Sequence, residues 1–501
     1  MSPPANQSSA PPLVAADPAR VAAADRVIAR LGLTTRTGDR GFHVLDPANG
    51  RAVATVPNLD GDAAVDSVMR AAQAGNAWAR RTPRERAAVL QSWFELLVEN
   101  AGDLALLITR EMGKRLDEAR AEIAYGCDFV RWYAEEAVRP RGDLRPLPGG
   151  GADLFVRRAP VGLSVLITPW NFPLAMATRK IAPALAAGCP VVIKPSELTP
   201  LTTMLAVTLA HEAGVPDDLI GVVTTTDAPT FSERVLRDPR ARKVSFTGST
   251  AVGRALLRLA ADNVLRSSME LGGNAPFIVF DDADLERAVD GALAAKLRNG
   301  GQSCIAANRF YVQEEIAEAF VDAFTDKMAG LTVGSGFADA VDLGPLINGR
   351  AVARCDELVA DAADRGAVVR CGGTTIRSDG CFFPPTVIDH VPADAAVAQN
   401  EIFGPIAAIQ RFDTEQEVVA RANDTNRGLA GYVYTESLDR AFNVADALET
   451  GLVGINQGVP SNAAAPFGGV KQSGLGREGS SEGIEEYQEV RYYNLARRAT
   501  Y

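Results

Sequence analysis

One cysteine and one glutamate in this chain each stand beside a glycine pair, an arrangement that suits a reactive side chain. Cys304 ends the sequence Asn299-Gly300-Gly301-Gln302-Ser303-Cys304, and Glu270 precedes Leu271-Gly272-Gly273, 34 residues upstream. A cysteine attacks as its thiolate, and only a few per cent of a free thiol is ionised at neutral pH. A nucleophilic Cys304 therefore needs a base. The three histidines lie far from these motifs in sequence, so Glu270 is the expected proton acceptor.

Taken alone, Cys304 has a simpler interpretation as a small buried apolar residue, because most free cysteines are of that kind. The six cysteines form no CxxC pair, and with three histidines the sequence offers no zinc-binding pattern. We therefore expect no metal site. Cysteines scattered through a large chain are typical of a reducing compartment.

Length and charge restrict the class of protein. A chain of 501 residues exceeds the size at which a single hydrophobic core stops growing, so two or three domains are expected. The net charge of −11 argues against a nucleic-acid partner and against a basic membrane-surface helix. Residues 1–20 lack the basic start and apolar core of a signal peptide and are expected to form a flexible tail. No apolar run reaches the roughly 18 residues of a membrane span, so we expect a cytoplasmic protein.

The middle of the chain alternates apolar runs with helical stretches, a pattern typical of a parallel sheet covered by helices on both faces. The first set of predicted strands comprises 161–168, 191–194, 219–223, 243–246 and 276–280. Ligands bind beyond the carboxyl ends of such strands. The residues of chemical interest follow these ends: Trp170 and Asn171, Lys194 and Glu197, Gly248 and Ser249.

A second alternating set predicts a second α/β domain, which Cys304 opens. Its predicted strands are 309–312, 367–370, 406–411, 431–435 and 452–456. Upstream, Thr82-Pro83-Arg84-Glu85 has the composition of a capped helix start, and helices are expected to about Val138. Residues 140–152, with their prolines and glycines, predict a connector, and 487–496 predict a last strand that pairs outside its own domain.

Three motifs at strand ends have both a chemical and a structural interpretation. The Asn171 amide could donate to an oxyanion, or it could cap a helix. Lys194 and Glu197 could bind ribose hydroxyls, with the carboxylate repelling a 2′-phosphate, or they could form a solvated ion pair. Gly248-Ser249 joins a strand to a helix whose free N–H groups suit a dinucleotide pyrophosphate.

Two glycine-rich segments match nucleotide-binding patterns in spacing alone. Residues 474–479 fit GxGxxG but follow no clear strand, so we interpret them as a loop. Residues 248–253 have the spacing of a phosphate loop, but Arg254 and Ala255 stand where that motif needs lysine and a hydroxyl residue. An NTPase is therefore disfavoured.

Six motifs occur together in the order and spacing of the aldehyde dehydrogenase superfamily, which the chain resembles from about Asp46 to about Tyr493. They are Pro169-Trp170-Asn171-Phe172-Pro173, Lys194-Pro195-Ser196-Glu197, Phe246-Thr247-Gly248-Ser249-Thr250, Glu270-Leu271-Gly272-Gly273, Gly301-Gln302-Ser303-Cys304 and Glu401-Ile402-Phe403-Gly404-Pro405. Within the superfamily, residues 178–180, 269–284 and 456–469 are similar to succinate-semialdehyde dehydrogenases.

The resemblance implies an α/β fold with three parts. A Rossmann-like NAD-binding domain (21–140 and 161–272) would be joined to an α/β catalytic domain (273–470). A small β oligomerisation arm (141–160 and 485–501) would project from them. Superfamily members assemble by strand addition between subunits, so a homodimer or homotetramer is expected.

The resemblance also implies a reaction. Cys304 would attack the aldehyde carbonyl, the Asn171 amide and the Cys304 N–H would hold the oxyanion, and hydride loss to a nicotinamide would leave a thioester. Glu270 would activate the water that hydrolyses this thioester, because relatives that pass the acyl group to coenzyme A lack a glutamate here. The implied cofactor-binding residues are Thr168, Trp170, Lys194, Glu197, Gly248, Ser249, Leu271, Glu401 and Phe403.

Cofactor and substrate follow from the same resemblance. Glu197 favours NAD, with NADP as the alternative, since some succinate-semialdehyde enzymes lack this glutamate and use NADP. A substrate carboxylate would be held by Arg179, Arg298 and Ser461, which implies oxidation of succinate semialdehyde to succinate. Glutarate semialdehyde, one methylene longer, is an alternative substrate, and a catalytically silent binding relative is an alternative of another class. Ala306 stands where some relatives carry a second cysteine, so no local disulfide is expected.

Overall fold

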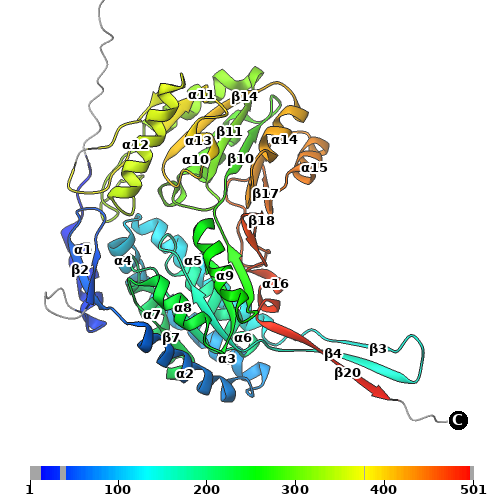
Figure 1. Cartoon of the computed structure of the whole chain (residues 1–501). Coiled ribbons are helices and arrows are strands. Elements are labelled where there is room, and N and C mark those ends of the chain that lie inside the picture. Colours follow the sequence, from blue (N-terminus) through cyan, green and yellow to red (C-terminus); the bar gives the residue numbers. More distant parts are fainter. Residues whose placement is uncertain (1–12, 34–40, 377, 497–501) are drawn as a thin grey trace, which may run out of the picture.

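Two α/β lobes and a projecting β arm make up the structure (Figure 1), a computed structural model that describes residues 13–33, 41–376 and 378–496. The first lobe is built on a six-stranded sheet and the second on a seven-stranded sheet. The expected α/β class, with two α/β lobes and a β arm, is confirmed. None of the described helices is long and apolar enough to cross a membrane.

The first sheet has the strand order β19-β9-β8-β5-β6-β7, and all neighbours pair in parallel except β19, which runs antiparallel to β9. Its strands are β5 (Leu163–Ile167), β6 (Val191–Lys194), β7 (Ile220–Val222), β8 (Ala241–Thr247), β9 (Arg266–Glu270) and β19 (Gly474–Leu475). Each parallel strand ends on the same side of the sheet, so the segments that follow them meet at one edge.

Helices cover both faces of this sheet because successive strand residues point in opposite directions. Leu166 of β5 packs with α3 (Pro83–Glu99), α4 (Ala101–Met112), α5 (Leu116–Glu136), α6 (Ala175–Ala187) and α7 (Leu201–Glu212). Val165 and Ile167 pack on the other face with α2 (Gly61–Trp78), α8 (Ala228–Leu236) and α9 (Thr250–Ala261). A short 3-10 turn, η1 (Asp217–Leu219), leads into β7.

The second sheet has the order β12-β13-β14-β11-β10-β16-β17 and is parallel except for β12. Its strands are β10 (Ala275–Val279), β11 (Ala307–Gln313), β12 (Val368–Cys371), β13 (Thr386–Asp389), β14 (Ile406–Phe412), β16 (Ala430–Tyr434) and β17 (Leu452–Ile455). The helices of this lobe are α10 (Leu285–Leu297), α11 (Glu314–Ala329), α12 (Gly349–Asp364), α13 (Ala396–Gln399), α14 (Glu415–Asn423) and α15 (Leu438–Ala447).

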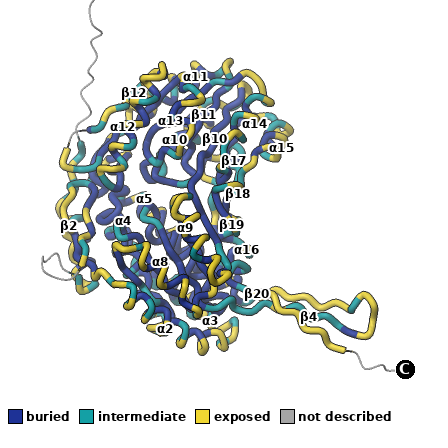
Figure 2. Tube along the Cα trace, in the orientation of Figure 1, coloured by how far each residue is buried: buried dark blue, intermediate teal, exposed yellow. Residues whose placement is uncertain are grey.

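The arm is a three-stranded antiparallel sheet, β20-β4-β3, that extends away from both lobes in Figure 1. It consists of β3 (Asp143–Pro146), β4 (Ala152–Pro160) and β20 (Gln488–Ala496), the last reached through α16 (Ser480–Glu485). Figure 2 shows most of the arm as exposed, in contrast to the buried sheets of the lobes. The remaining elements are α1 (Pro18–Arg30), the hairpin β1 (Gly41–Leu45) and β2 (Ala52–Pro57), and the pair β15 (Arg427–Gly428) and β18 (Val470–Lys471).

Most predicted elements are present, and several differ in extent. The capping box at Thr82 and Glu85 forms as expected at the start of α3, and the predicted last strand is β20. The run 276–280 is β10, which lies in the second sheet beside β11, so Cys304 lies within this lobe instead of opening it. The expected connector contains β3. Strands β9 and β13 were not predicted, because residues 266–270 and 386–389 are not long apolar runs.

The predicted tail also differs. Residues 1–12 lie outside the described residues, as do 497–501 of the predicted arm. Val14 forms a bridge with Gly334, and α1 begins at Pro18 behind an N-cap at Asp17, so residues 13–20 belong to the folded part.

Candidate active site

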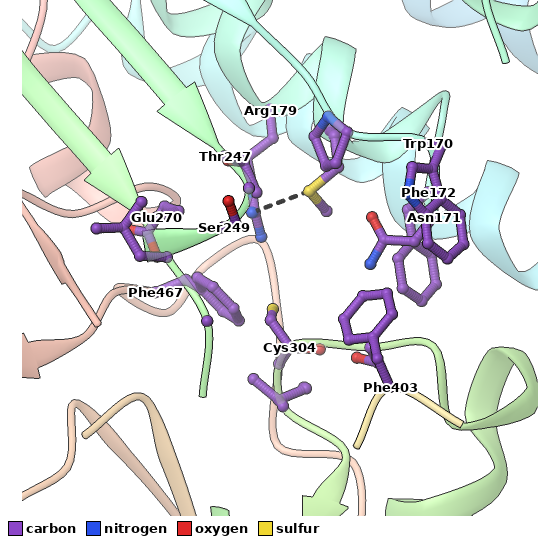
Figure 3. Close-up of a pocket in the computed structure, with 18 of the residues that line it drawn as sticks. Trp170, Asn171, Phe172, Arg179, Thr247, Ser249, Glu270, Cys304, Phe403 and Phe467 are labelled. Atoms are coloured by element: carbon purple, nitrogen blue, oxygen red, sulfur yellow. Dashed lines mark hydrogen bonds between the residues drawn. The ribbon is translucent and has the colours of Figure 1, made fainter. Parts of the chain in front are cut away.

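A cavity between the two lobes brings together residues from seven segments that lie far apart in the sequence, several of which are drawn in Figure 3. Of the predicted site residues, it is lined by Trp170, Asn171, Arg179, Gly248, Ser249, Glu270, Leu271, Arg298, Cys304, Glu401, Phe403 and Ser461. Residues that the sequence analysis did not single out also line it, among them Tyr125, Phe172, Met176, Thr247 and Phe467. Thr168, Lys194 and Glu197 do not line this cavity.

The glycines around Cys304 permit a left-handed turn and a close backbone approach. Asn299, Gly300 and Gly301 have φ values of 58°, 65° and 74° in succession. A Cβ on Gly301 would lie 2.2 Å from the Gly404 carbonyl oxygen, and one on Gly273 would lie 2.3 Å from the carbonyl oxygen of Cys304. Larger side chains at these two glycines would displace the cysteine turn.

The Cys304 thiol is not activated by its protein surroundings alone. Burial raises its pKa to about 12, although the positive charge of Arg179 acts in the opposite direction. The thiolate is the attacking species, so a base or a bound cation is needed to form it. In Figure 3 the sulfur points into the cavity, where an electrophile could reach it.

Glu270 is a buried carboxylate poised to accept a proton. It ends β9 and is 2% exposed, and neither carboxylate oxygen has a hydrogen-bond partner among the described residues. Burial, with the nearby charge of Glu478, raises the pKa of Glu270 well above its usual value, and Arg179 offsets part of this effect. A carboxylate with a raised pKa in a cavity is typical of a general base.

The Asn171 side chain faces the cysteine turn and does not cap a helix. Helix α6 begins later, with Leu174 as its N-cap. The Asn171 Nδ2 donates to the Gln302 carbonyl at 3.1 Å, two residues before Cys304, and its Oδ1 has no partner among the described residues. An amide held there can donate to an oxyanion formed at the sulfur.

Two carboxylates on one face of α5, with Lys114 two residues before that helix, support the cysteine turn and the start of α6, a feature that the sequence analysis missed. Glu118 accepts from the Asn299 N–H at 2.8 Å, and Glu122 accepts from the N–H groups that begin α6. Lys114 bridges Glu122 at 2.5 Å and donates to the Asn171 carbonyl at 2.9 Å. Apart from the Lys114–Glu122 ion pair, each of these contacts joins residues more than 50 positions apart, so local patterns do not reveal them.

The three predicted carboxylate-binding residues lie in the cavity but in different electrostatic settings. The Arg298 Nη1 donates to the Ser461 Oγ at 3.2 Å, and no described carboxylate forms an ion pair with Arg298. Its guanidinium lies 5.3 Å from the Tyr125 ring centre and 5.1 Å from that of Phe172. By contrast, the Arg179 Nε lies 2.5 Å from a carboxylate oxygen of Glu478.

Glu478 is a buried residue. The sequence analysis placed it in a predicted loop and assigned it no role. The predicted loop 474–479 begins with the short strand β19, which pairs with β9 at Glu270. Glu478 contacts both Arg179 and Lys180. Although burial acts to raise its pKa, these two cations hold the pKa of Glu478 below its usual value. The negative charge of Glu478 acts in turn on Glu270 and raises the pKa of that carboxyl.

The residues fit a nicotinamide dinucleotide. Ser249 caps α9, whose N-terminus follows β8 directly and suits a pyrophosphate. The rings of Trp170 and Phe403 pack edge-on, with their centroids 5.5 Å apart. Phe403 has a left-handed φ of 55°. Glu401 accepts from the Gly273 N–H at 3.2 Å and pairs with Arg427 at 3.3 Å.

Two more predicted cofactor residues lie beyond the cavity, at the end of β6. The Lys194 Nζ lies 3.5 Å from the Glu197 carboxylate, and burial lowers the pKa of Lys194. Glu197 keeps 44% of its side chain exposed, so it can meet a ligand that extends from the cavity. The backbone N–H of Thr168 donates to the Lys194 carbonyl.

Comparisons with known proteins agree with this geometry. The family model described as "Aldehyde dehydrogenase family" matches residues 34–493. A succinate-semialdehyde dehydrogenase of Paenarthrobacter nicotinovorans is 51% identical over 444 residues, which cover 89% of this chain and 99% of the relative. A glutarate-semialdehyde dehydrogenase of Pseudomonas putida is 49% identical over 451 residues, 90% of this chain and 93% of the relative.

Solved structures give the same result. An E. coli structure described as an NADP-dependent enzyme superposes with a TM-score of 0.90 at 48% identity, covering 91% of this chain and 95% of that one. The expected resemblance is thereby confirmed. The chain belongs to the aldehyde dehydrogenase family, as an NAD(P)-dependent aldehyde dehydrogenase similar to succinate-semialdehyde dehydrogenases.

Proposed function

We propose that this protein oxidises succinate semialdehyde to succinate with NAD and releases the free acid. The observation that carries the proposal is Arg298, a cavity-lining guanidinium bonded to Ser461 and lacking an ion-paired carboxylate among the described residues. A cation without a counter-ion in the same cavity as Cys304 suits an aldehyde that carries a distant carboxylate. The glutarate-semialdehyde relative supports the same class of substrate and leaves the chain length open.

In the first step Cys304 adds to the aldehyde. Glu270 accepts the thiol proton, the sulfur bonds to the carbonyl carbon, and the carbonyl oxygen becomes an oxyanion. The Asn171 amide and the Cys304 N–H donate to this oxyanion. Removal of one such donor typically lowers the rate by about 10²–10³-fold.

In the second step the acyl group is released as the acid. A bound nicotinamide dinucleotide supplies the acceptor for the substrate's hydride, and Cys304 is then acylated as a thioester. The proton that Glu270 took from the thiol first passes to solvent. The Glu270 carboxylate then takes a proton from a water molecule as its oxygen attacks the thioester carbon, the carbon–sulfur bond breaks, and Glu270 returns the proton to the sulfur. Because Glu270 is present and unpaired in the cavity, we propose hydrolysis and not transfer to coenzyme A.

Arg298→Ala tests the substrate. We expect the KM for succinate semialdehyde to rise about 10- to 100-fold with a smaller change in kcat, since a hydrogen bond to a charged group is worth about 1.5–3 kcal/mol. The KM for an aliphatic aldehyde without a carboxylate should change little. Steady-state kinetics on both aldehydes measure the difference.

Arg287→Ala is the matched control, because Arg287 is exposed on α10, the helix that ends just before Arg298, and does not line the cavity. Arg179→Ala is a less selective variant, since it also removes one of the two cations that pair with Glu478 beside Glu270. An equal loss on both aldehydes in Arg298→Ala would refute the carboxylate site.

A panel of semialdehydes of graded length then separates succinate from glutarate semialdehyde, whose difference of one methylene is worth only about 1–3 kcal/mol.

Glu197 supports NAD as the preferred cofactor, since its carboxylate would repel the 2′-phosphate of NADP. We expect Glu197→Ser to raise kcat/KM for NADP about 10-fold, the effect of removing roughly 1.4 kcal/mol of repulsion. Glu212→Ser, which removes an exposed charge from α7, should leave the ratio of the two cofactors unchanged. If the unaltered enzyme already prefers NADP at equal concentration, the assignment is wrong.

We also propose that the arm joins copies of this chain. Leu144, Val490, Tyr492 and Leu495 expose large apolar surface along β3 and β20. Apolar side chains in a projecting sheet with open edges favour pairing with another copy. Sedimentation of the full chain measures whether a dimer or a tetramer forms.

A further inference from the structure

We propose that a pocket at the base of the arm binds a polyphosphate anion, at a site separate from the active-site cavity. The pocket lies where β4 and β20 leave the first lobe, against the start of α3 and the ends of α5 and α6. Arginines dominate its charged lining: Arg81, Arg86, Arg139, Arg141, Arg157, Arg158 and Arg491, against Glu136 and Glu485. The whole chain has a net charge of −11, so this local excess of positive charge is unusual for the molecule.

Some of these arginines are neutralised by neighbours. Arg139 pairs with Glu136 at 3.0 Å, and Arg141 and Arg158 both pair with the single carboxylate of Glu485, at 3.2 and 3.1 Å. Arg86 donates to the carbonyl oxygens of Ala186 and Arg81, and the charges of Arg81 and Arg86 both act on the nearby Glu85 carboxylate. Arg157 and Arg491 form no ion pair with any described carboxylate. These two arginines of the pocket lining therefore lack counter-ions among the described residues.

The strand register places two of these positive charges opposite each other, which destabilises the arm. Arg157 of β4 and Arg491 of β20 are direct cross-strand partners in the antiparallel arm. Opposite residues in such a pair hold their Cβ atoms about 4.5–5.5 Å apart, and like charges placed there destabilise the sheet. An anion bound between the two side chains would replace this repulsion with attraction.

The side chains point to phosphates and not to a single halide or carboxylate. Guanidinium groups bind phosphate oxygens with two parallel hydrogen bonds, and several forks around one concavity suit an anion with two or more phosphates. Of the arm's large exposed apolar side chains, only Tyr493 lines the pocket. Since the centres of protein interfaces are depleted in charge, the pocket suits a small polyanion better than a second copy of the chain.

Calorimetric titration of the full chain with pyrophosphate tests this inference. Saturating NAD is present throughout, so that the pyrophosphate-binding N-terminus of α9 is already occupied. We expect one saturable event per chain, tighter for pyrophosphate than for inorganic phosphate at equal ionic strength. Arg157→Thr together with Arg491→Thr should weaken it at least about 10-fold, because two forked contacts are lost. Threonine suits both strand positions, so the arm should still fold.

Arg145→Thr is the matched control. Arg145 lies in β3 of the same arm, pairs with Asp143 and does not line the pocket, so its loss removes one positive charge from the arm without changing the site. Binding unchanged in the double variant, or equally weakened in the control, would overturn the proposal. So would the absence of binding to the unaltered chain. If the double variant instead changes the subunit association measured by sedimentation, a second copy fills the pocket and the polyphosphate site is excluded.

Discussion

Cys304→Ser should lower the rate of aldehyde oxidation by at least about 10³-fold, because the whole reaction proceeds through a bond to this sulfur. A serine hydroxyl is far less acidic than a thiol, and the surrounding burial that raises the pKa of Cys304 to about 12 would raise that of the hydroxyl further. Neither Glu270 nor the charge of Arg179 could then ionise enough of the serine hydroxyl for it to act as the nucleophile. The absorbance of the reduced cofactor measures the loss.

Cys381→Ser is the control for this variant. Cys381 is a free, partly exposed cysteine that does not line the cavity, so its replacement should leave the rate within about two-fold. Both variants should keep the melting temperature of the parent, since a single sulfur-to-oxygen change adds no volume. Acid product formed at the original rate by Cys304→Ser would contradict the proposed reaction, whatever the substrate.

The parts of the site that sequence could predict are those whose signal is local. Glycines beside Cys304 and Glu270 predicted backbone constraints at these positions. The structure shows two of them: the left-handed turn at 299–301 and the close approach of Gly273 to the Cys304 carbonyl. Apolar runs predicted most strands, because fully buried parallel strands are apolar along their length. Strand ends then located the candidate residues at one edge of each sheet.

The parts that sequence could not predict depend on contacts between distant segments. Glu478 lies 298 residues from Lys180 in the chain, and only folding shows that its charge faces Arg179 and Glu270. Glu118 reaches Asn299 across 181 residues. Strand β9 carries Glu270 and has the sequence Arg-Ser-Ser-Met-Glu. Ser268 donates to Glu486, and of the five residues only Met269 packs in an apolar cluster. No periodicity in the local sequence encodes these partners.

Arg179 illustrates the limit of assigning roles by residue type. The sequence analysis grouped it with Arg298 as a ligand of the substrate carboxylate, and both line the cavity. The buried ion pair with Glu478 already uses the Nε side of the Arg179 guanidinium, whereas Arg298 contacts a serine and two aromatic rings. Arg298 is therefore the sharper candidate for carboxylate binding, and Arg179 also tunes the charge at Cys304 and Glu270.

Glu270→Gln should separate the two halves of the reaction. The amide has nearly the shape of the carboxylate but cannot accept a proton from water, so steady-state turnover should fall by about 10²–10⁴-fold. If a fraction of Cys304 still ionises at high pH, acylation continues, and a burst of up to one reduced cofactor per active site should precede the slow phase. Rapid mixing of enzyme, NAD and aldehyde at pH values above neutrality measures both phases.

The pH dependence gives an independent check on the same residue. Burial and the charge of Glu478 raise the pKa of Glu270 well above its usual value, so the carboxylate is protonated and inactive as a base at acidic pH. The hydrolysis rate should therefore rise with pH through that raised pKa, and in Glu270→Gln this rise should disappear. Glu489→Gln, an exposed carboxylate on β20, should keep the profile of the parent. A variant at Glu270 that retains both the steady-state rate and the rising limb would show that another group activates the water.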